Sequence, residues 1–463
     1  MLVVSNRGPL SFRFDDDGTL HPVPGGGGLV SSIGPLLAGT GATWVSVTMG
    51  AADRAAVAQG RMTDENFTLL PVVIDDDTYR AAYDVVSNTT LWYCHHHLFD
   101  LPRRPRFDRY WRQAWDAYRR YNQSVADTVS AHAEADSTVL VQDYHFSLLG
   151  QMLARARPDL RTVHFCHIPF ADPNMLRVLP EEAAGELLAG LAGFGACGFH
   201  ARRWEAAFRA CYADPALGAL AGVGTAPPTF VSSLSSDHEG LLAEASSAAC
   251  ARSVETLRAE TGGRRIILRV DRVEPSKNIV RGMLAFEELL VAYPEWRDKV
   301  VHVALVYPSR QGLAEYLALG AEVTHVAERI NHAWGTATWT PIVLHVEDDR
   351  PRSLASLTIS DVLLVNPVRD GLNLVAKEGS LLNGGDGVLV LSHEAGAWEE
   401  LSEAALGINP FDVAGTADTL HRALSMGIEE RRSRAARLKE LVLARTASDW
   451  LNEQLAAVQP LSR

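Results

Sequence analysis

The chain of 463 residues carries a formal net charge of −13, with 47% apolar and 21% charged residues. These values are typical of a globular protein with two or three domains, and they exclude a disordered chain, a collagen-like fibre and a disulfide scaffold. The acidic balance also argues against a nucleic-acid-binding protein, which would need a basic face.

The cysteines and the N-terminal residues indicate a cytoplasmic location. The five cysteines show no paired spacing, so we expect buried thiols in a reducing cytoplasm rather than disulfides or a metal site. The first residues lack the leader of a secretory signal, and no stretch approaches the roughly 18 apolar residues of a membrane span. Three consecutive histidines, residues 95–97, do not predict a metal site either, because neighbouring side chains do not converge on one ion.

Short apolar strands alternate with helical segments along the whole chain. Strands are predicted at Leu2–Ser5, Thr138–Gln142, Thr162–Cys166, Ile266–Val270, Val300–Val306, Ile342–Val346, Val362–Val365 and Val388–Leu391. Helices are predicted within Glu181–Tyr212, where glycines interrupt the pattern, over Asn278–Tyr293, and from Ser448 onward. Continuous apolar strands separated by helices indicate parallel sheets covered on both faces.

A polar stretch near residues 248–265 predicts the domain boundary. We therefore expect an α/β protein of two Rossmann-like domains whose parallel sheets face each other across a cleft. The N-terminal domain would span residues 1–250 and the C-terminal domain residues 264–445, with a final helix over 446–463 packing back on the first domain. Because ligands of open α/β sheets bind at the carboxyl ends of the strands, the chemistry is expected in the cleft.

Two polar clusters follow predicted strands in the C-terminal half. Arg272 and Lys277 come after a buried strand, and two cations beside a helix start form a phosphate site that could neutralise a diphosphate leaving group. In the second cluster, Asp370 and Gly371 form a turn before a helix that carries Glu378. Backbone N–H groups there could hold phosphate, and the carboxylate could bind a ribose diol. A solvated loop and an ordinary capped helix are the alternatives.

Polar residues also follow strands in the N-terminal half. Arg7, Asp143 and His167 each stand at or just after a strand end, which would direct them into the cleft, although a structural histidine is an equal alternative for His167. The glycines Gly25–Gly28 do not match the spacing of a dinucleotide-binding loop. They favour a mobile loop that closes over a sugar nucleotide, with a plain flexible loop as the alternative.

Eight ordered segments carry a family resemblance: Val3–Arg7, Ser87–Trp92, Gln142–His145, His167–Phe170, Val270–Lys277, Pro308–Arg310, Arg369–Glu378 and Asn409–Asp412. Together they resemble the trehalose-6-phosphate synthases, retaining GT-B enzymes of glycosyltransferase family 20. The resemblance implies transfer of glucose from GDP-glucose or UDP-glucose to glucose 6-phosphate, giving trehalose 6-phosphate. It implies a nucleotide diphosphate sugar and a sugar phosphate as partners, with no cofactor, metal, nucleic acid or membrane, and it leaves a homo-oligomer open.

The resemblance also implies roles for individual residues. The implied catalytic residues are Arg272, Lys277, Asp143 and His167. The implied donor-binding residues are Gly28, Asp370, Gly371, Asn373, Leu374 and Glu378. The implied acceptor-binding residues are Arg7, Tyr83, Trp92 and Arg310. In this scheme Arg7 and Arg310 hold the 6-phosphate of the acceptor, and His167 lies at the 6-hydroxyl of the donor sugar.

Two positions depart from the family pattern and leave other functions open. Val47 stands where a second tryptophan is usual, and Ser233 stands where a glycine is usual. These changes spare the donor residues but put the acceptor in doubt. The alternatives are a pseudoglycosyltransferase that couples a nucleotide-activated cyclitol to an aminocyclitol phosphate, and a catalytically silent sensor of sugar phosphates.

Overall fold

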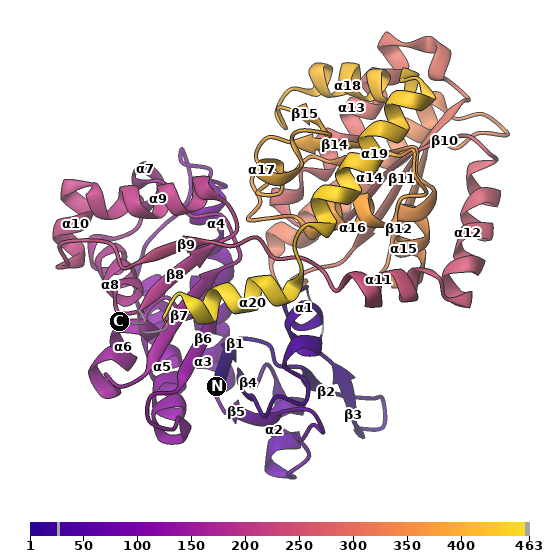
Figure 1. Cartoon of the computed structure of the whole chain (residues 1–463). Helices are drawn as coiled ribbons and strands as arrows, with labels where there is room; N and C mark the ends of the chain where they lie inside the picture. The colour runs from indigo at the N-terminus through magenta and orange to yellow at the C-terminus, as the bar shows by residue number, and fades with distance from the viewer. Residues whose placement is uncertain (26–27, 459–463) are drawn as a thin grey trace. The chain divides into compact units, whose positions relative to one another are not determined.

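The computed structural model describes residues 1–25 and 28–458, and the chain divides into two compact units (Figure 1). Unit 1 contains Met1–Leu234 and the C-terminal segment that begins at Ala447, whereas unit 2 contains Ser235–Thr446. The chain therefore leaves unit 1 after Leu234 and returns to it at Ala447. Within the described ranges, no helix combines the length and apolar character needed to cross a bilayer.

Unit 1 is built on a seven-stranded parallel sheet in the order β5-β4-β1-β6-β7-β8-β9. Its strands are β1 (Leu2–Ser5), β4 (Thr43–Val47), β5 (Thr68–Val72), β6 (Thr138–Gln142), β7 (Arg161–Cys166), β8 (Ala196–Phe199) and β9 (Thr229–Val231). A separate antiparallel hairpin is formed by β2 (Leu10–Phe14) and β3 (Leu20–Pro24). The strand order reverses between β1 and β6, so the loops after these two strands begin next to each other.

Helices cover both faces of this sheet. The main apolar core lies under α5 (Arg109–His132), α6 (Leu149–Ala156), α8 (Glu181–Ala192) and α9 (Arg202–Ala213). On the opposite face, Phe165 of β7 meets Trp450 of α20 (Ala447–Ala456), with ring centroids 5.0 Å apart, and α1 (Gly28–Leu37) packs beside α20. The remaining helical segments of unit 1 are α2 (Ala51–Ala58), α3 (Asp76–Arg80), a π-helical segment (Ala81–Leu91), α4 (Trp92–His95), a 3₁₀ helix (Tyr144–Phe146), α7 (Pro173–Leu176) and α10 (Pro215–Ala221).

Unit 2 contains a six-stranded parallel sheet in the order β12-β11-β10-β13-β14-β15, which is the strand order of a dinucleotide-binding Rossmann fold. Its strands are β10 (Arg265–Arg272), β11 (Val300–Tyr307), β12 (Ile342–Val346), β13 (Val362–Val365), β14 (Val388–Ser392) and β15 (Leu406–Ile408). The order reverses between β10 and β13. A ligand of such a sheet binds at the carboxyl ends of these two strands.

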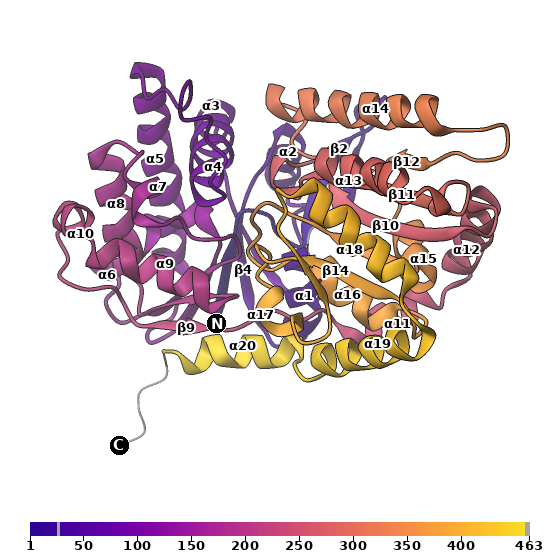
Figure 2. The same cartoon turned by 90° about the horizontal axis from the view of Figure 1, so that it is seen from above.

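Two helical layers enclose the sheet of unit 2 (Figure 2). One layer contains α13 (Ile279–Ala292), α14 (Ala314–Trp334) and α18 (Val413–Ser425), and the other contains α12 (Ala248–Thr261), α15 (Arg350–Ile359), α16 (Leu374–Leu382) and α19 (Ile428–Leu443). Unit 2 also contains two shorter helices, α11 (His238–Ala245) and α17 (Trp398–Leu401), and two 3₁₀ helices (Pro275–Lys277 and Pro294–Trp296). Because α11 and α12 pack on α15, the chain divides before these helices, at Ser235.

The predicted α/β class with two parallel Rossmann-like sheets is confirmed, and each of the eight predicted strands is present. The helical prediction within Glu181–Tyr212 was wrong at its centre, because β8 lies between α8 and α9. All four residues of β8 are buried. Such a short apolar run cannot be distinguished from buried helix by its periodicity, which explains the error.

The role of α20 is testable by substituting its central tryptophan. Trp450→Ala should lower the free energy of unfolding by about 3–5 kcal/mol, because it removes a fully buried indole from the face that carries Phe165. Urea unfolding followed by circular dichroism measures this change. The control Leu443→Ala alters a side chain that is 46% exposed and should change the stability by less than about 0.5 kcal/mol. Unchanged stability of Trp450→Ala would contradict the packing role of α20.

Candidate functional site

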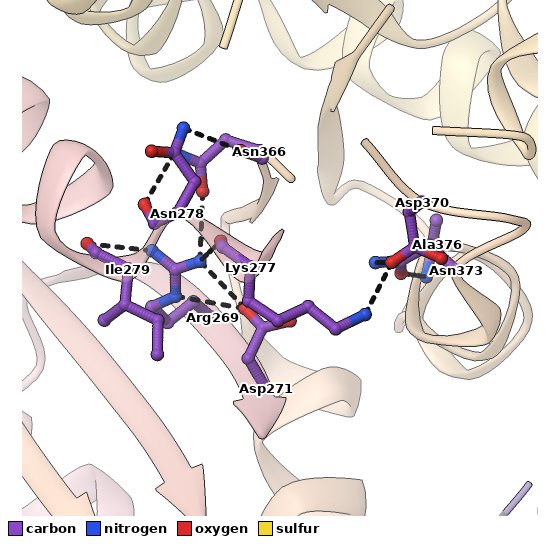
Figure 3. A network of polar contacts seen from close by, with 9 residues as sticks. All are labelled: Arg269, Asp271, Lys277, Asn278, Ile279, Asn366, Asp370, Asn373 and Ala376. Atoms are coloured by element: carbon purple, nitrogen blue, oxygen red, sulfur yellow. Dashed lines mark hydrogen bonds and ion pairs between the residues drawn. The ribbon is translucent and has the colours of Figure 1, made fainter. Parts of the chain in front are cut away.

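A buried guanidinium organises the carboxyl ends of β10 and β13. Arg269 is 0% exposed and donates hydrogen bonds to the Asp271 carboxylate at 2.8 and 3.1 Å. It also donates to the carbonyl oxygens of Lys277 and Ile279, at 2.9 and 3.2 Å, and to Oδ1 of Asn366 at 3.0 Å (Figure 3). Asn366 follows β13, and the other acceptors belong to β10, the loop after it and the first residue of α13. Arg269 therefore connects the two loops at the reversal of strand order.

Asn278 shapes the start of the helix that follows Lys277. Its backbone lies in the left-handed region, at φ 59°, immediately before α13. Its side-chain amide donates to the carbonyl oxygens of Asn366 and Pro410, at 2.9 and 2.7 Å. These bonds fix the turn that presents Lys277.

Lys277 points away from the Arg269 network toward the loop after β13 (Figure 3). Its Nζ lies 2.5 Å from Oδ2 of Asp370, which also accepts a hydrogen bond from Asn373. Burial lowers the pKa of Lys277, but the charges of Asp370 and Asp271 outweigh this effect and raise the pKa above its ordinary value. The ammonium group is therefore held charged.

The loop after β13 leads into α16 through Asn373, whose φ is 77°. The side chain of Asn373 caps the helix by accepting a hydrogen bond from the backbone N–H of Ala376 at 3.2 Å. Leu374 is the first residue of α16, and Gly371 lies in the loop before it. The expected donor-binding loop thus stands beside Lys277, at the positive end of a helix.

Arg272 shares a carboxylate partner with Arg310. Oε1 of the buried Glu274 lies 3.3 Å from Nη1 of Arg272 and 3.6 Å from Nη1 of Arg310. The carboxylate of Glu274 raises the pKa of Arg272. The side chain of Arg272 is 47% exposed and accessible to a ligand. Arg310 is largely buried, and its guanidinium lies over the ring of Tyr316 at 5.5 Å.

Glu378, the expected ribose ligand, lies on α16 in unit 2. Its carboxylate accepts a hydrogen bond from the hydroxyl of Ser236 at 3.4 Å. Burial raises the pKa of Glu378, and the nearby charge of Arg350 partly offsets the rise. The carboxylate therefore stands in a partly desolvated position with a cation nearby.

In unit 1, the expected acceptor residues Arg7 and Tyr83 lie near the reversal between β1 and β6. Arg7 follows β1 and is exposed. Tyr83 stacks on Tyr79 at 5.1 Å and on His145, which follows β6, at 5.5 Å. Burial raises the pKa of Tyr79, whereas the positive charge of Arg7 lowers it. The guanidinium of Arg7 therefore influences the ring on which Tyr83 stacks.

Trp92 and the two residues that depart from the family pattern, Val47 and Ser233, are buried. Trp92 is 2% exposed and packs in the main core against Tyr93 and His96, so the structure gives it a packing role. Val47 lies in the same core, and Ser233 is buried after β9. Of the glycine segment, Gly28 is the first residue of α1, whereas residues 26–27 lie outside the described residues.

Asp143 has the most unusual backbone among the expected site residues. Its φ of 74° and ψ of 169° belong to a region that is almost restricted to glycine. Its backbone N–H donates to the carbonyl of Phe165 at 2.8 Å, and its carboxylate accepts from the N–H of His167 at 3.3 Å. Strain of this kind is characteristic of functional sites, because the surrounding structure must maintain it.

His167 lies beside Asp143, and both nitrogens of its ring have partners within unit 1. Nε2 lies 2.9 Å from Oε1 of Gln142, and Nδ1 lies 3.1 Å from Nε2 of His200. Burial lowers the pKa of His167 to about 3, with a smaller contribution from His164. The ring is therefore neutral near pH 7, and a sugar hydroxyl would have to replace one of its partners.

Sequence reasoning missed the residues that support the site from behind. Arg269, Asn278, Asn366 and His200 received no role, although Arg269 interrupts an otherwise apolar strand. A charged residue in a buried strand is a usable signal, because it must find partners. His200 had no such signal, since it follows β8, a strand whose pattern also fits a helix.

Comparison with known proteins identifies a family. The model of glycosyltransferase family 20 matches residues 1–460. A trehalose-6-phosphate synthase of Mycolicibacterium paratuberculosis is 32% identical, over 99% of this chain and 94% of the relative. The Dictyostelium discoideum alpha,alpha-trehalose-phosphate synthase [UDP-forming] A is 30% identical over 97% of this chain. The chain spans 61% of that relative's length.

Two solved structures have the same fold. An E. coli structure described as bound with UDP-2-fluoro glucose superimposes with a TM-score of 0.85 at 28% identity, covering 100% of this chain and 99% of the other. A Burkholderia xenovorans alpha,alpha-trehalose-phosphate synthase in complex with glucose-6-phosphate gives a TM-score of 0.85 at 27% identity, covering 99% of each chain.

The low pKa values of two histidines predict that acid destabilises unit 1. In the folded protein the pKa is lowered from 6.5 to about 4 for His164 and to about 3 for His167, so the unfolded chain binds their protons first as the pH falls. This stability is complete above pH 6.5 and is lost below it, by up to about 1.4 kcal/mol per pH unit for each histidine. Urea unfolding across this range should show a shallower decline for His167→Gln. An identical decline would contradict the assignment.

Arg269 and Arg272 lie on the same strand, but substituting them should change the stability of the protein to different extents. Arg269→Ala leaves Asp271 as a buried carboxylate without its partner, and it should lower the free energy of unfolding by about 3–5 kcal/mol. The matched control Arg272→Ala removes a half-exposed cation and should cost less than about 1 kcal/mol. Thermal and urea unfolding measure both changes. Equal losses in the two variants would show that the buried network is not the main support of these loops.

Proposed function

The chain belongs to glycosyltransferase family 20, and we propose that it is a retaining glycosyltransferase that transfers glucose from a nucleotide diphosphate to glucose 6-phosphate, forming trehalose 6-phosphate. One observation carries the proposal. Arg272 and Lys277, two cations paired with the buried Glu274 and the partly buried Asp370, stand where the strand order of a Rossmann sheet reverses. The names of the relatives and the bound molecules of the two solved structures support the same reaction.

Unit 2 is proposed to bind the donor. Lys277 and Arg272 would hold the diphosphate, and the loop from Asp370 to the start of α16 would hold the sugar and phosphate. An ammonium group has three donor hydrogens, so Lys277 can hold Asp370 and a phosphate oxygen together. Glu378 would bind the ribose. Gly28, in unit 1, is also proposed near the donor, as the family resemblance implies.

Unit 1 supplies Arg7, Tyr83 and Trp92 of the proposed acceptor residues, and unit 2 supplies Arg310. Arg7 offers an exposed cation for a sugar phosphate, and Tyr83 offers an aromatic surface stacked on Tyr79, the ring on which the charge of Arg7 acts. Arg310 is the second expected phosphate ligand, and Glu274 and Tyr316 are among the residues it contacts. Its role at the acceptor stays a prediction, as does a contact of the acceptor with the buried Trp92.

The proposed mechanism needs stabilisation of the leaving group more than acid–base catalysis. As the glycosidic bond to the nucleotide breaks, positive charge develops on the sugar and negative charge on the departing diphosphate. Preorganised cations such as Arg272 and Lys277 stabilise that negative charge. The acceptor hydroxyl attacks from the face that the diphosphate leaves, and a phosphate oxygen takes its proton. No pair of carboxylates at glycosidase spacing is then required, and we propose that Asp143 and His167 contribute by orienting the reacting sugars.

The reaction and its donor are tested together. The purified protein is mixed with glucose 6-phosphate and either GDP-glucose or UDP-glucose, and release of the nucleoside diphosphate is measured. Proton NMR of the product then gives the anomeric configuration, for which we expect retention. Turnover only with a nucleotide-activated cyclitol would replace this proposal with the pseudoglycosyltransferase alternative. Binding of sugar phosphate without any turnover would indicate a sensor.

Loss of the two cations should impair the chemical step. Arg272→Ala and Lys277→Ala should each lower kcat/KM by about 10²-fold or more, because the negative charge of the leaving group loses a preorganised partner. The matched control Lys299→Ala removes an exposed lysine before β11 and should leave activity unchanged. Initial rates at varied donor concentration measure the effect in folded protein. Activity near the unsubstituted level in both variants would exclude this mechanism.

A further inference from the structure

A continuous line of hydrogen bonds runs through His167. It begins at the backbone N–H of Leu234, which donates to Nδ1 of His200 at 3.4 Å. Nε2 of His200 lies 3.1 Å from Nδ1 of His167, whose Nε2 lies 2.9 Å from Oε1 of Gln142. The line ends where Nε2 of Gln142 donates to Oε1 of Gln454, on α20, at 3.2 Å. Five residues from distant parts of the chain are thus joined within unit 1.

The first bond favours one direction for the others, and the bond to Gln454 at the far end agrees with it. A backbone N–H can only donate, so Nδ1 of His200 accepts and carries no proton. Neutral His200 then has its proton on Nε2 and donates to Nδ1 of His167. His167 in turn carries its proton on Nε2 and donates to the amide oxygen of Gln142. This orientation turns the amide nitrogen of Gln142 toward the oxygen of Gln454, as observed.

The surroundings of His167 oppose its protonation. Burial and the neighbouring His164 both lower its pKa. The indole of Trp450 lies 5.8 Å from the His167 ring, and the carboxylate of Asp143 accepts a hydrogen bond from the backbone N–H of His167. His200 also faces the ring, and its Nδ1 is already occupied by the N–H of Leu234. A neutral ring with one defined tautomer satisfies all of these contacts.

Packing alone does not explain a glutamine at position 454, because burying its polar side chain lowers the stability of the protein. Its side chain is 0% exposed, and its Nε2 has no hydrogen-bond partner among the described residues. A buried polar group without a partner is destabilising, and an apolar side chain of similar length would avoid that cost. The one bond that Gln454 makes through Oε1 is the bond that orients Gln142.

We propose that Gln454, together with the backbone N–H of Leu234, is a positioning group that holds His167 neutral with its proton on Nε2. Leu234 is the last residue before the chain leaves unit 1, and α20 begins where the chain returns. His167 is therefore held by residues from the two places where the chain leaves unit 1 and returns to it. The part played by His167 in glucosyl transfer rests on the proposed function, whereas the hydrogen-bond line does not.

The full chain labelled with ¹⁵N-histidine tests this proposal directly. In the unsubstituted protein, the His167 ring should show a protonated Nε2 and an unprotonated Nδ1, with no titration near pH 6.5, and His167→Gln assigns the signal. Gln454→Met keeps the length of the side chain but removes the acceptor oxygen. With the Gln454 end of the line released, Gln142 can reverse its amide. The long 3.4 Å bond from Leu234 alone no longer excludes the reversed direction, so both tautomers of His167 should appear. The kcat should fall about tenfold with a nearly constant KM for the donor, because only orientation is lost.

Two further variants separate positioning from simple packing. Gln454→Glu retains an acceptor oxygen and should restore the single tautomer. Leu451→Ala weakens the packing of α20 without touching the line, so it should lower stability and leave the His167 signal unchanged. A single Nε2-protonated tautomer in Gln454→Met, or mixed tautomers with unchanged kcat, would overturn the proposal. Absence of glucosyl transfer in the unsubstituted protein would instead refute the proposed function, while the NMR result would still decide the hydrogen-bond line.

Discussion

The charge of Arg269 in the middle of β10 is the constraint on which the candidate donor site depends. A buried cation is tolerated only when its donors are satisfied, and here the acceptors are Asp271, Asn366 and two backbone carbonyls of the loop after β10. The helix above must also leave room, because a Cβ at Gly282 of α13 would lie 2.3 Å from the Arg269 guanidinium. Both loops are therefore fixed before any ligand arrives, which is the condition for electrostatic preorganisation.

Much of the fold was predictable because its strands are continuous apolar runs. Each predicted strand exists. Lys277 comes close to Asp370 and Asn373 because the strands before them, β10 and β13, are neighbours in one sheet. The proximity of residues after parallel strands follows from topology alone. The order of the strands within each sheet was not predicted. The short buried strand β8 was not predicted either, because its pattern also fits a helix.

The details that escaped prediction depend on contacts between residues far apart in the sequence. The resemblance assigns Trp92 to the acceptor pocket, and its burial in the core of unit 1 depends on contacts that the sequence pattern does not show. The shared carboxylate of Glu274 beneath Arg272 and Arg310, and the strained backbone of Asp143, likewise arise only once the strands are in place. The sequence pattern therefore identified chemical groups more reliably than their partners.

Unit 1 is discontinuous along the chain, since α20 follows the whole of unit 2. A ribosome therefore releases the sheet of unit 1 long before it makes the helix that covers the Phe165 face. Unit 2, which is continuous from Ser235 to Thr446, can fold as soon as it emerges. The unit that is synthesised first is thus the last to mature, and the nascent chain exposes an apolar sheet face throughout translation of the second unit.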